Sequence, residues 1–153
     1  MNNINFPMCA VICSQSNNTD ISIQDISIKI EKIYRSGVHD FMCSCEKGII
    51  MLSALAILDL KKKFNNNIGL HIVMPFENQA DNWSEEIRRQ FFTIHEFADS
   101  VKILTPHRNA SVHKIYTDCN KYIIDQSTCL VTDKNNELIP YALSKSIDVF
   151  EFF

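Results

Sequence analysis

Polar and aromatic residues that could bind a small molecule follow four apolar runs of the chain. These groups are Cys13-Ser14, Ser44-Cys45-Glu46 with Gly48, the stretch "PFENQADNW" (residues 75–83), and Thr105-Pro106-His107. The backbone N–H groups between Ser44 and Gly48 could form an anion-binding nest at the start of a helix. A plain turn between a strand and a helix, without a ligand, fits the same residues equally well.

The third group has the residue types that recognise a base or a ribose. Phe76 and Trp83 could stack on a ring, and Gln79 could hydrogen-bond its edge. In that case Trp83, the only tryptophan, should be partly exposed at a cleft and Gln79 should point toward Ser44. The alternative is that Trp83 packs on the sheet where the next helix begins. Asn120, on a later helix, could contact the same ligand or satisfy buried backbone groups.

Groups that could support catalysis or bind a metal are present, but their positions and spacing are only a weak signal for either function. Glu46 and Glu77 could act as an acid–base pair, although only their loop positions suggest it. Cys13, Cys43 and Cys45 could bind a soft metal or act as redox groups, but they lack the spacing of a metal motif. We therefore expect no catalytic residues and no metal site, and we expect the thiols to pack as small apolar residues.

The elements that would position these groups alternate regularly along the chain. Short apolar runs, typical of buried strands, cover residues 8–13, 39–45, 69–76, 100–106, 128–133 and 147–153. Between them, helical periodicity covers residues 23–34 with Gly37 at the end, 47–64, 85–98, 115–123 and 138–145. Residues 21–28, "ISIQDISI", alternate as a strand would and are ambiguous. Asn82 and Glu85 have the spacing of a capping box for the third helix.

Strands that alternate with helices predict βα units and a parallel sheet. The predicted fold class is α/β: a Rossmann-like three-layer sandwich with a mostly parallel sheet of five or six strands and helices on both faces. No linker or repeat interrupts residues 1–153, so a single domain is expected. In such a sheet a ligand binds beyond the carboxyl ends of the strands, where the strand order reverses.

Composition and charge exclude several classes of protein. The net charge of −3 argues against nucleic-acid binding, which needs clustered Lys and Arg. The longest apolar run, "GIIMLSALAIL", is shorter than the ~20 residues that span a bilayer. No secretory segment is recognised at the start of the chain, and a reduced, cytoplasmic protein is expected.

Four blocks of the sequence carry a family resemblance. They are "FMCSCEKGIIMLSALAILDL", "VMPFENQADNW", "FADSVKIL" and "DCNKYIIDQSTCLVTD". Together they resemble the YpsA-like branch of the SLOG superfamily over about residues 9–133, with matches at Pro75, Gln79, Trp83 and Asn120. The resemblance implies a Rossmann-like fold and an association with nucleotides, nucleotide sugars and ligands derived from NAD or ADP-ribose.

The sequence departs from the family pattern where phosphate would bind. Cys45 stands where the family has glycine, Ile50 where it has an acidic residue, and Cys13-Ser14 where it has Thr-Gly. Only Gly48 remains of the glycine-rich turn after the second strand. Glycine allows the closest approach of backbone to phosphate. We therefore expect the Cys45 side chain to narrow the space for a phosphate in this turn.

These observations favour a small-molecule binding module for a nucleotide or an ADP-ribose- or NAD-derived ligand, with no required cofactor. The expected ligand-binding residues are Cys13, Ser14, Ser44, Cys45, Glu46, Gly48, Pro75, Phe76, Gln79, Trp83 and Asn120. The alternative is a degenerate relative that lost its ligand and acts on a protein partner as an inhibitor or regulator. A nucleotide-cleaving hydrolase is the third hypothesis. No membrane partner is expected, and self-association into a homo-oligomer is left open.

Overall fold

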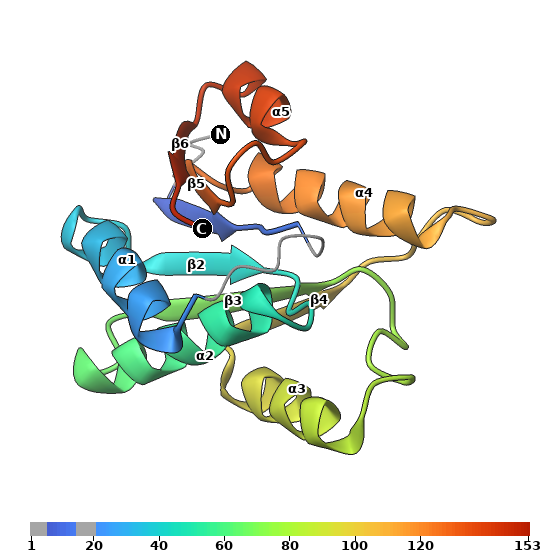
Figure 1. Ribbon diagram of the computed structural model, residues 1–153, viewed down its shortest axis with the longest axis horizontal. Helices are drawn as coiled ribbons and strands as arrows, with labels where there is room; N and C mark the ends of the chain where they lie inside the picture. The colour runs from blue at the N-terminus through green and yellow to red at the C-terminus, as the bar shows by residue number, and fades with distance from the viewer. Residues whose placement is uncertain (1–5, 15–20) are drawn as a thin grey trace.

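The structure, a computed structural model, describes residues 6–14 and 21–153, which form alternating strands and helices (Figure 1). Within these residues the strands are β1 (Met8–Val11), β2 (Asp40–Cys43), β3 (Gly69–Met74), β4 (Ser100–Ile103), β5 (Cys129–Thr132) and β6 (Asp148–Glu151). The helices are α1 (Ile23–Arg35), α2 (Ile49–Lys63), α3 (Glu85–Phe97), α4 (Val112–Asp125) and α5 (Ile139–Ser144).

The strands form one sheet in the order β4-β3-β2-β1-β5-β6, and every neighbouring pair is parallel. From β1 the chain builds outward through β2, β3 and β4. It then crosses back over the sheet through α4 to place β5 on the other side of β1, paired Cys9 to Cys129. The strand order therefore reverses between β1 and β5, which confirms the predicted α/β, Rossmann-like class.

Helices cover both faces of the sheet, as predicted (Figure 1). Buried residues of α1, α2 and α3, such as Ile30, Ile57 and Ile94, pack in one apolar cluster on one face. On the other face α4 and α5 pack through Ile123 and Ala142 in a second cluster. All six cysteines are free and buried, which agrees with the expectation that they pack as small apolar residues.

The ambiguous stretch at residues 21–28 becomes the start of helix α1. The Ser22 side chain caps this helix by accepting a hydrogen bond of 3.1 Å from the Asp25 backbone N–H. Ile26, Ile30 and Ile33 then recur at helical spacing on the buried face. Tertiary burial thus outweighs the strand propensity of the isoleucines. Gly37 follows the last cap residue with φ +107°, the conformation for which glycine is favoured.

The start of α3 differs from the expected capping box. Ser84, not Asn82, is the cap residue, and its hydroxyl accepts a hydrogen bond of 3.4 Å from the Ile87 N–H. Asn82 lies in the preceding turn and is exposed. The sequence offered two suitable cap residues two positions apart, and the turn that places Trp83 against the core decides between them.

No helix in the described part of the chain combines the length and the apolar character that crossing a membrane requires.

Candidate functional site

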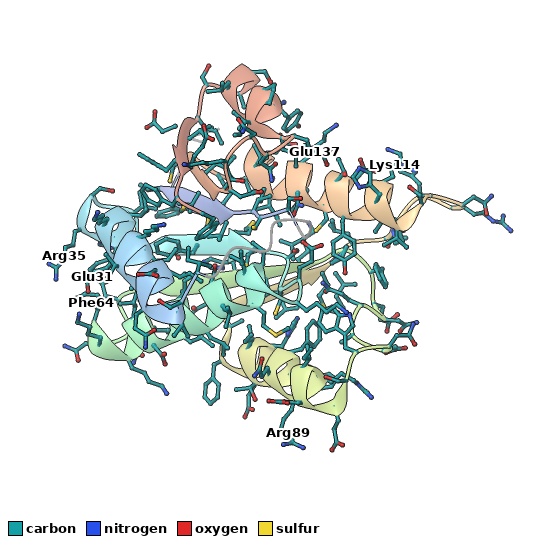
Figure 2. The ribbon with its side chains drawn as sticks, in the orientation of Figure 1. Glu31, Arg35, Phe64, Arg89, Lys114 and Glu137 are labelled. Atoms are coloured by element: carbon teal, nitrogen blue, oxygen red, sulfur yellow. The ribbon has the colours of Figure 1, made fainter. Side chains whose placement is uncertain are left out.

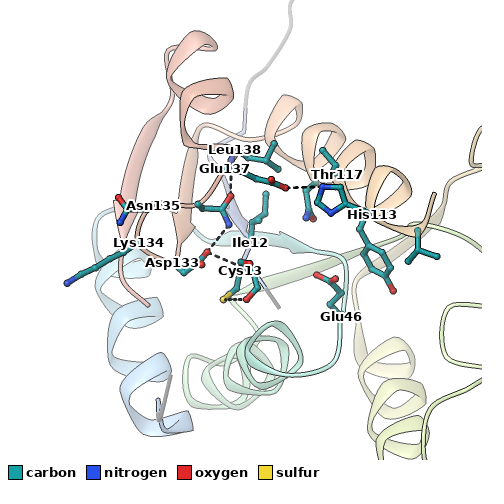
Figure 3. A pocket seen from close by; sticks show the side chains of 15 residues that line it. Ile12, Cys13, Glu46, His113, Thr117, Asp133, Lys134, Asn135, Glu137 and Leu138 are labelled. Carbon is teal, nitrogen blue, oxygen red and sulfur yellow. Dashed lines mark hydrogen bonds and ion pairs between the residues drawn. The ribbon is translucent and has the colours of Figure 1, made fainter. Parts of the chain in front are cut away.

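A cavity of about 790 Å³ opens at the carboxyl ends of β1 and β5 (Figure 3). Its size is that of ordinary small-molecule sites. It lies at the reversal of strand order, where open parallel sheets place their ligands. The lining residues are Ile12, Cys13, Ser14, Glu46, Val112, His113, Tyr116, Thr117, Asn120, Asp133, Lys134, Asn135, Asn136, Glu137 and Leu138.

The carboxylate of Asp133 holds the two strand ends together at the cavity floor. Its Oδ1 accepts hydrogen bonds from the Ser14 backbone N–H at 3.1 Å, the Thr132 hydroxyl at 3.2 Å and the Asn136 amide at 2.7 Å. The Asn136 side chain in turn accepts the Leu138 N–H at 2.9 Å. Because Asp133 and Asn136 are both buried, this network fixes the shape of the loop after β5.

A second carboxyl group, Glu46, lies in the wall formed by the loop after β2. Glu46 is only 6% exposed, and burial raises the pKa of its carboxyl group to about 7. The nearby Cys13 thiol stays protonated at neutral pH, because burial and the charges of Asp133 and Glu46 raise its pKa to about 12. The cavity therefore contains a carboxyl group that changes charge near neutral pH and a thiol that does not act as a nucleophile there.

Helix α4 forms the opposite wall. Val112, His113, Tyr116, Thr117 and Asn120 line the cavity at helical spacing, so they share one face of the helix. His113 and Glu137 lie at the mouth, with 3.6 Å between the His113 Nε2 and the Glu137 Oε1. Figure 3 shows this pair bridging α4 and the loop after β5.

The "PFENQADNW" loop reaches the site through Gln79. The buried Gln79 amide Nε2 donates to the Ser44 carbonyl at 3.1 Å and to the Tyr116 hydroxyl at 3.4 Å. Gln79 thus points toward Ser44, as expected from the sequence. Its Oε1 is buried and finds no hydrogen-bond partner among the described residues. Phe76 packs edge-on against Tyr116, with 6.2 Å between the ring centroids.

The expected site residues fall into three groups. Cys13, Ser14, Glu46 and Asn120 line the cavity. A second group does not line the cavity but is connected to Tyr116, which is a lining residue. Gln79 hydrogen-bonds both Ser44 and Tyr116, and the Phe76 ring contacts the Tyr116 ring. Cys45, Gly48, Pro75 and Trp83 are outside the lining. The structure therefore brings the first group together around the cavity and leaves the last group out of its lining.

Cys45 occupies the position of the missing glycine without obstructing the cavity. Its backbone takes φ +56°, the left-handed conformation that a glycine would adopt easily. Its side chain is fully buried in the apolar cluster beneath α1, α2 and α3. The expectation that the Cys45 side chain narrows the turn is therefore wrong, because the thiol packs into the core.

Trp83 is half-buried and packs at the start of α3. Its ring meets Phe91 edge-on at 5.5 Å between centroids, and the Lys47 ammonium lies 6.0 Å from the ring centroid. These contacts fit the alternative in which Trp83 packs where α3 begins, while its partial exposure agrees with the ligand-loop hypothesis. The aromatic side chain that lines the cavity is Tyr116.

The loop after β5 and most of the α4 wall were not predicted from the sequence. Asp133, Asn135, Asn136 and Glu137 are polar residues directly after an apolar strand, which is the signal used for the other four loops. The i, i+4, i+8 spacing of Val112, Tyr116 and Asn120 would have grouped Tyr116 with Asn120. Neither signal was used, because the neighbour of β1 in the sheet was not known.

These features define an α/β protein with a polar cavity at its topological switch point. Residues 10–149 match the family described as the YspA SLOG family (YpsA), so the chain belongs to that family. A UPF0398 protein of Brevibacillus brevis is 31% identical over 106 residues, which cover 67% of this chain and 54% of that protein. A UPF0398 protein of Halalkalibacterium halodurans is 27% identical over 105 residues, covering 67% and 53%. The chain spans about half the length of these relatives.

Glu46 should make stability depend on pH. In the unfolded chain a glutamate has a pKa of about 4.3. Between this value and about 7 the folded protein retains a proton that the unfolded chain has released. The free energy of unfolding therefore falls as pH rises through this window, by about 2–4 kcal/mol. Glu46→Gln should remove the slope and stabilise the protein above pH 7, as measured by urea unfolding across the window.

The matched control for this measurement is Glu77→Gln, which removes an exposed carboxylate from the neighbouring loop. It should leave the pH dependence of unfolding unchanged. If the free energy of unfolding depends on pH equally in the Glu46 variant and the unmodified protein, burial of Glu46 is not the cause of the pH dependence.

Trp83→Ala should destabilise the folded protein and not only reduce its affinity for a ligand. Truncation removes the edge contact with Phe91 and exposes part of the apolar cluster. Because the ring is half-buried, we expect a loss of about 2–4 kcal/mol in the free energy of unfolding, near the lower end for large aromatics. Denaturant unfolding followed by circular dichroism measures it, since the variant has no tryptophan fluorescence. If the free energy of unfolding of the variant is unchanged, the hypothesis that Trp83 stacks on a ligand is favoured again.

Proposed function

We propose that this chain is a small-molecule binding module and that its ligand is a nucleotide or a compound derived from NAD or ADP-ribose. The observation that carries the proposal is the 790 Å³ cavity, which is lined mostly by polar side chains and lies at the reversal of strand order. Membership in the SLOG family supports the same kind of ligand.

The lining supplies groups suited to a ribose and a base. Asp133 and Glu46 have carboxyl oxygens that accept hydrogen bonds from hydroxyl groups. Thr117 and Asn120, one turn apart on α4, offer donors and acceptors at the wall. Tyr116, held by Gln79 and Phe76, presents the aromatic side chain on which a ring could pack.

Catalysis is not part of the proposal. Glu46 lines the cavity, but Glu77 is exposed in the third loop and does not. An acid–base pair of these two carboxyl groups therefore has no support in the arrangement of the site. Binding alone accounts for the observed cavity.

The experiment is a thermal-shift and calorimetry panel of nucleosides, nucleotides, NAD and ADP-ribose. A ligand that binds only the folded state must raise its stability. At about 100 times the dissociation constant the melting temperature should rise by about 5–10 °C. Asn120→Ala should stay folded, because Asn120 is only partly buried, and should bind about 5- to 30-fold more weakly through loss of a hydrogen bond.

Asn82→Ala is the matched control, since Asn82 is exposed and outside the cavity lining. It should bind like the unmodified protein. If no compound stabilises the protein, the binding proposal fails and action through protein contacts takes its place. The exposed apolar side chains of Phe97, Val101 and Ile103, along α3 and the edge strand β4, favour that second candidate.

A further inference from the structure

We propose that the cavity selects the uncharged or cationic part of its ligand, a ribose with its base, and that any phosphate groups lie outside it. This inference rests on the proposed function and specifies which chemical part of the ligand the cavity holds. It differs from the sequence-based expectation of a phosphate-binding nest at the start of α2.

The charges around the cavity are mostly negative. Among the described residues, three carboxyl groups line it, those of Glu46, Asp133 and Glu137, against one lysine, Lys134. Lys134 is exposed, and Figure 3 shows its side chain extending away from the three carboxyl groups. His113 is the remaining basic group in the lining, and it already faces Glu137 at 3.6 Å. A phosphate inside the cavity would meet more negative than positive charge.

Acidic side chains lie near the positions that usually bind phosphate. A helix N-terminus attracts anions through its free N–H groups. At α2 the buried Glu46 lies two residues before Gly48, the residue that precedes the helix. At α4 the Ser111 hydroxyl accepts the Lys114 N–H at 3.1 Å, and Glu137 lies beside His113 in the first turn. A carboxyl group therefore stands near each helix start that borders the cavity.

The same carboxyl groups suit a ligand rich in hydroxyl groups. A carboxylate only accepts hydrogen bonds, and the hydroxyls of a ribose are donors that can satisfy it. An acidic side chain on ribose hydroxyls is the usual arrangement in dinucleotide-binding folds. Three hydrogen bonds to its Oδ1 hold Asp133 in position, so a ligand in the cavity would meet this carboxyl group in a defined orientation.

The test compares matched pairs, so the identity of the base need not be known. Calorimetric affinities are measured on the full chain for adenosine, guanosine, cytidine and uridine and for their 5′-mono- and diphosphates, at pH above 7. Nicotinamide riboside adds a nucleoside with a positive ring. For each nucleoside that binds, every added phosphate should lower the affinity about three- to tenfold at moderate salt. This difference in affinity should shrink as the salt concentration is raised.

Glu137→Gln removes one exposed carboxylate from the mouth of the cavity and is not expected to disturb folding. It should raise the affinity for the monophosphate relative to that for the nucleoside about threefold. Glu96→Gln, an exposed site on α3 outside the lining, changes the net charge equally and should affect neither ligand.

The outcomes separate the two proposals. Nucleosides that bind more tightly than their phosphates support the inference, and equal affinities overturn it. Affinity that rises with each phosphate overturns it and leaves the binding proposal intact. An absence of binding by every compound overturns both, because there is then no ligand for the cavity to select. An equal effect of Glu96→Gln and Glu137→Gln would also overturn it, since the local charge would then not matter.

Discussion

The reversal of strand order between β1 and β5 is the constraint on which the site depends. On one side of β1 the chain continues through α1 to β2, and on the other side β5 arrives from α4. The two connections leave on opposite faces, so the carboxyl ends of these strands are not closed by a single crossover helix. The Asp133 network then joins the two ends and gives the opening a fixed floor. Both the cavity and its polar lining follow from this arrangement.

The walls of the cavity are held by a connection that runs through the interior. Gln79 joins the loop after β2, the loop after β3 and helix α4. Charged side chains such as Arg89 on α3 and Arg35 on α1 extend outward from the ribbon instead (Figure 2). A buried amide can make such a connection because it carries two donors on one nitrogen. The Pro-Phe loop therefore acts on the site as a support for Tyr116. This indirect role reconciles the resemblance of the loop to a ligand-binding loop with its observed packing in the interior.

Much of the fold could be predicted from the sequence, because each strand is a short apolar run and each helix has its own period. Cys13, Ser14, Glu46 and Asn120 were found because they follow strands or match a family position. The loop after β5 was missed for a physical reason: the strand beside β1 is set by long-range pairing, which no local pattern encodes. The direction of the Cys45 side chain was likewise missed, since a left-handed backbone turns the thiol into the core.

Energetically costly polar groups lie toward both ends of the sheet. At the carboxyl end of the sheet, Glu46 is buried with a raised pKa, and the Gln79 Oε1 is buried without a partner among the described residues. Near the opposite end, Asp99 accepts from Lys61 at 2.7 Å and from the Leu70 N–H at 2.8 Å, and His71 meets Asp40 at 2.9 Å. The His95 Nε2, near the end of α3, is nevertheless buried without a partner among the described residues. Folding alone favours the satisfied arrangement everywhere. Of these costly groups, Glu46 lines the cavity, so a carboxyl group with a perturbed pKa lies where the proposed ligand would bind.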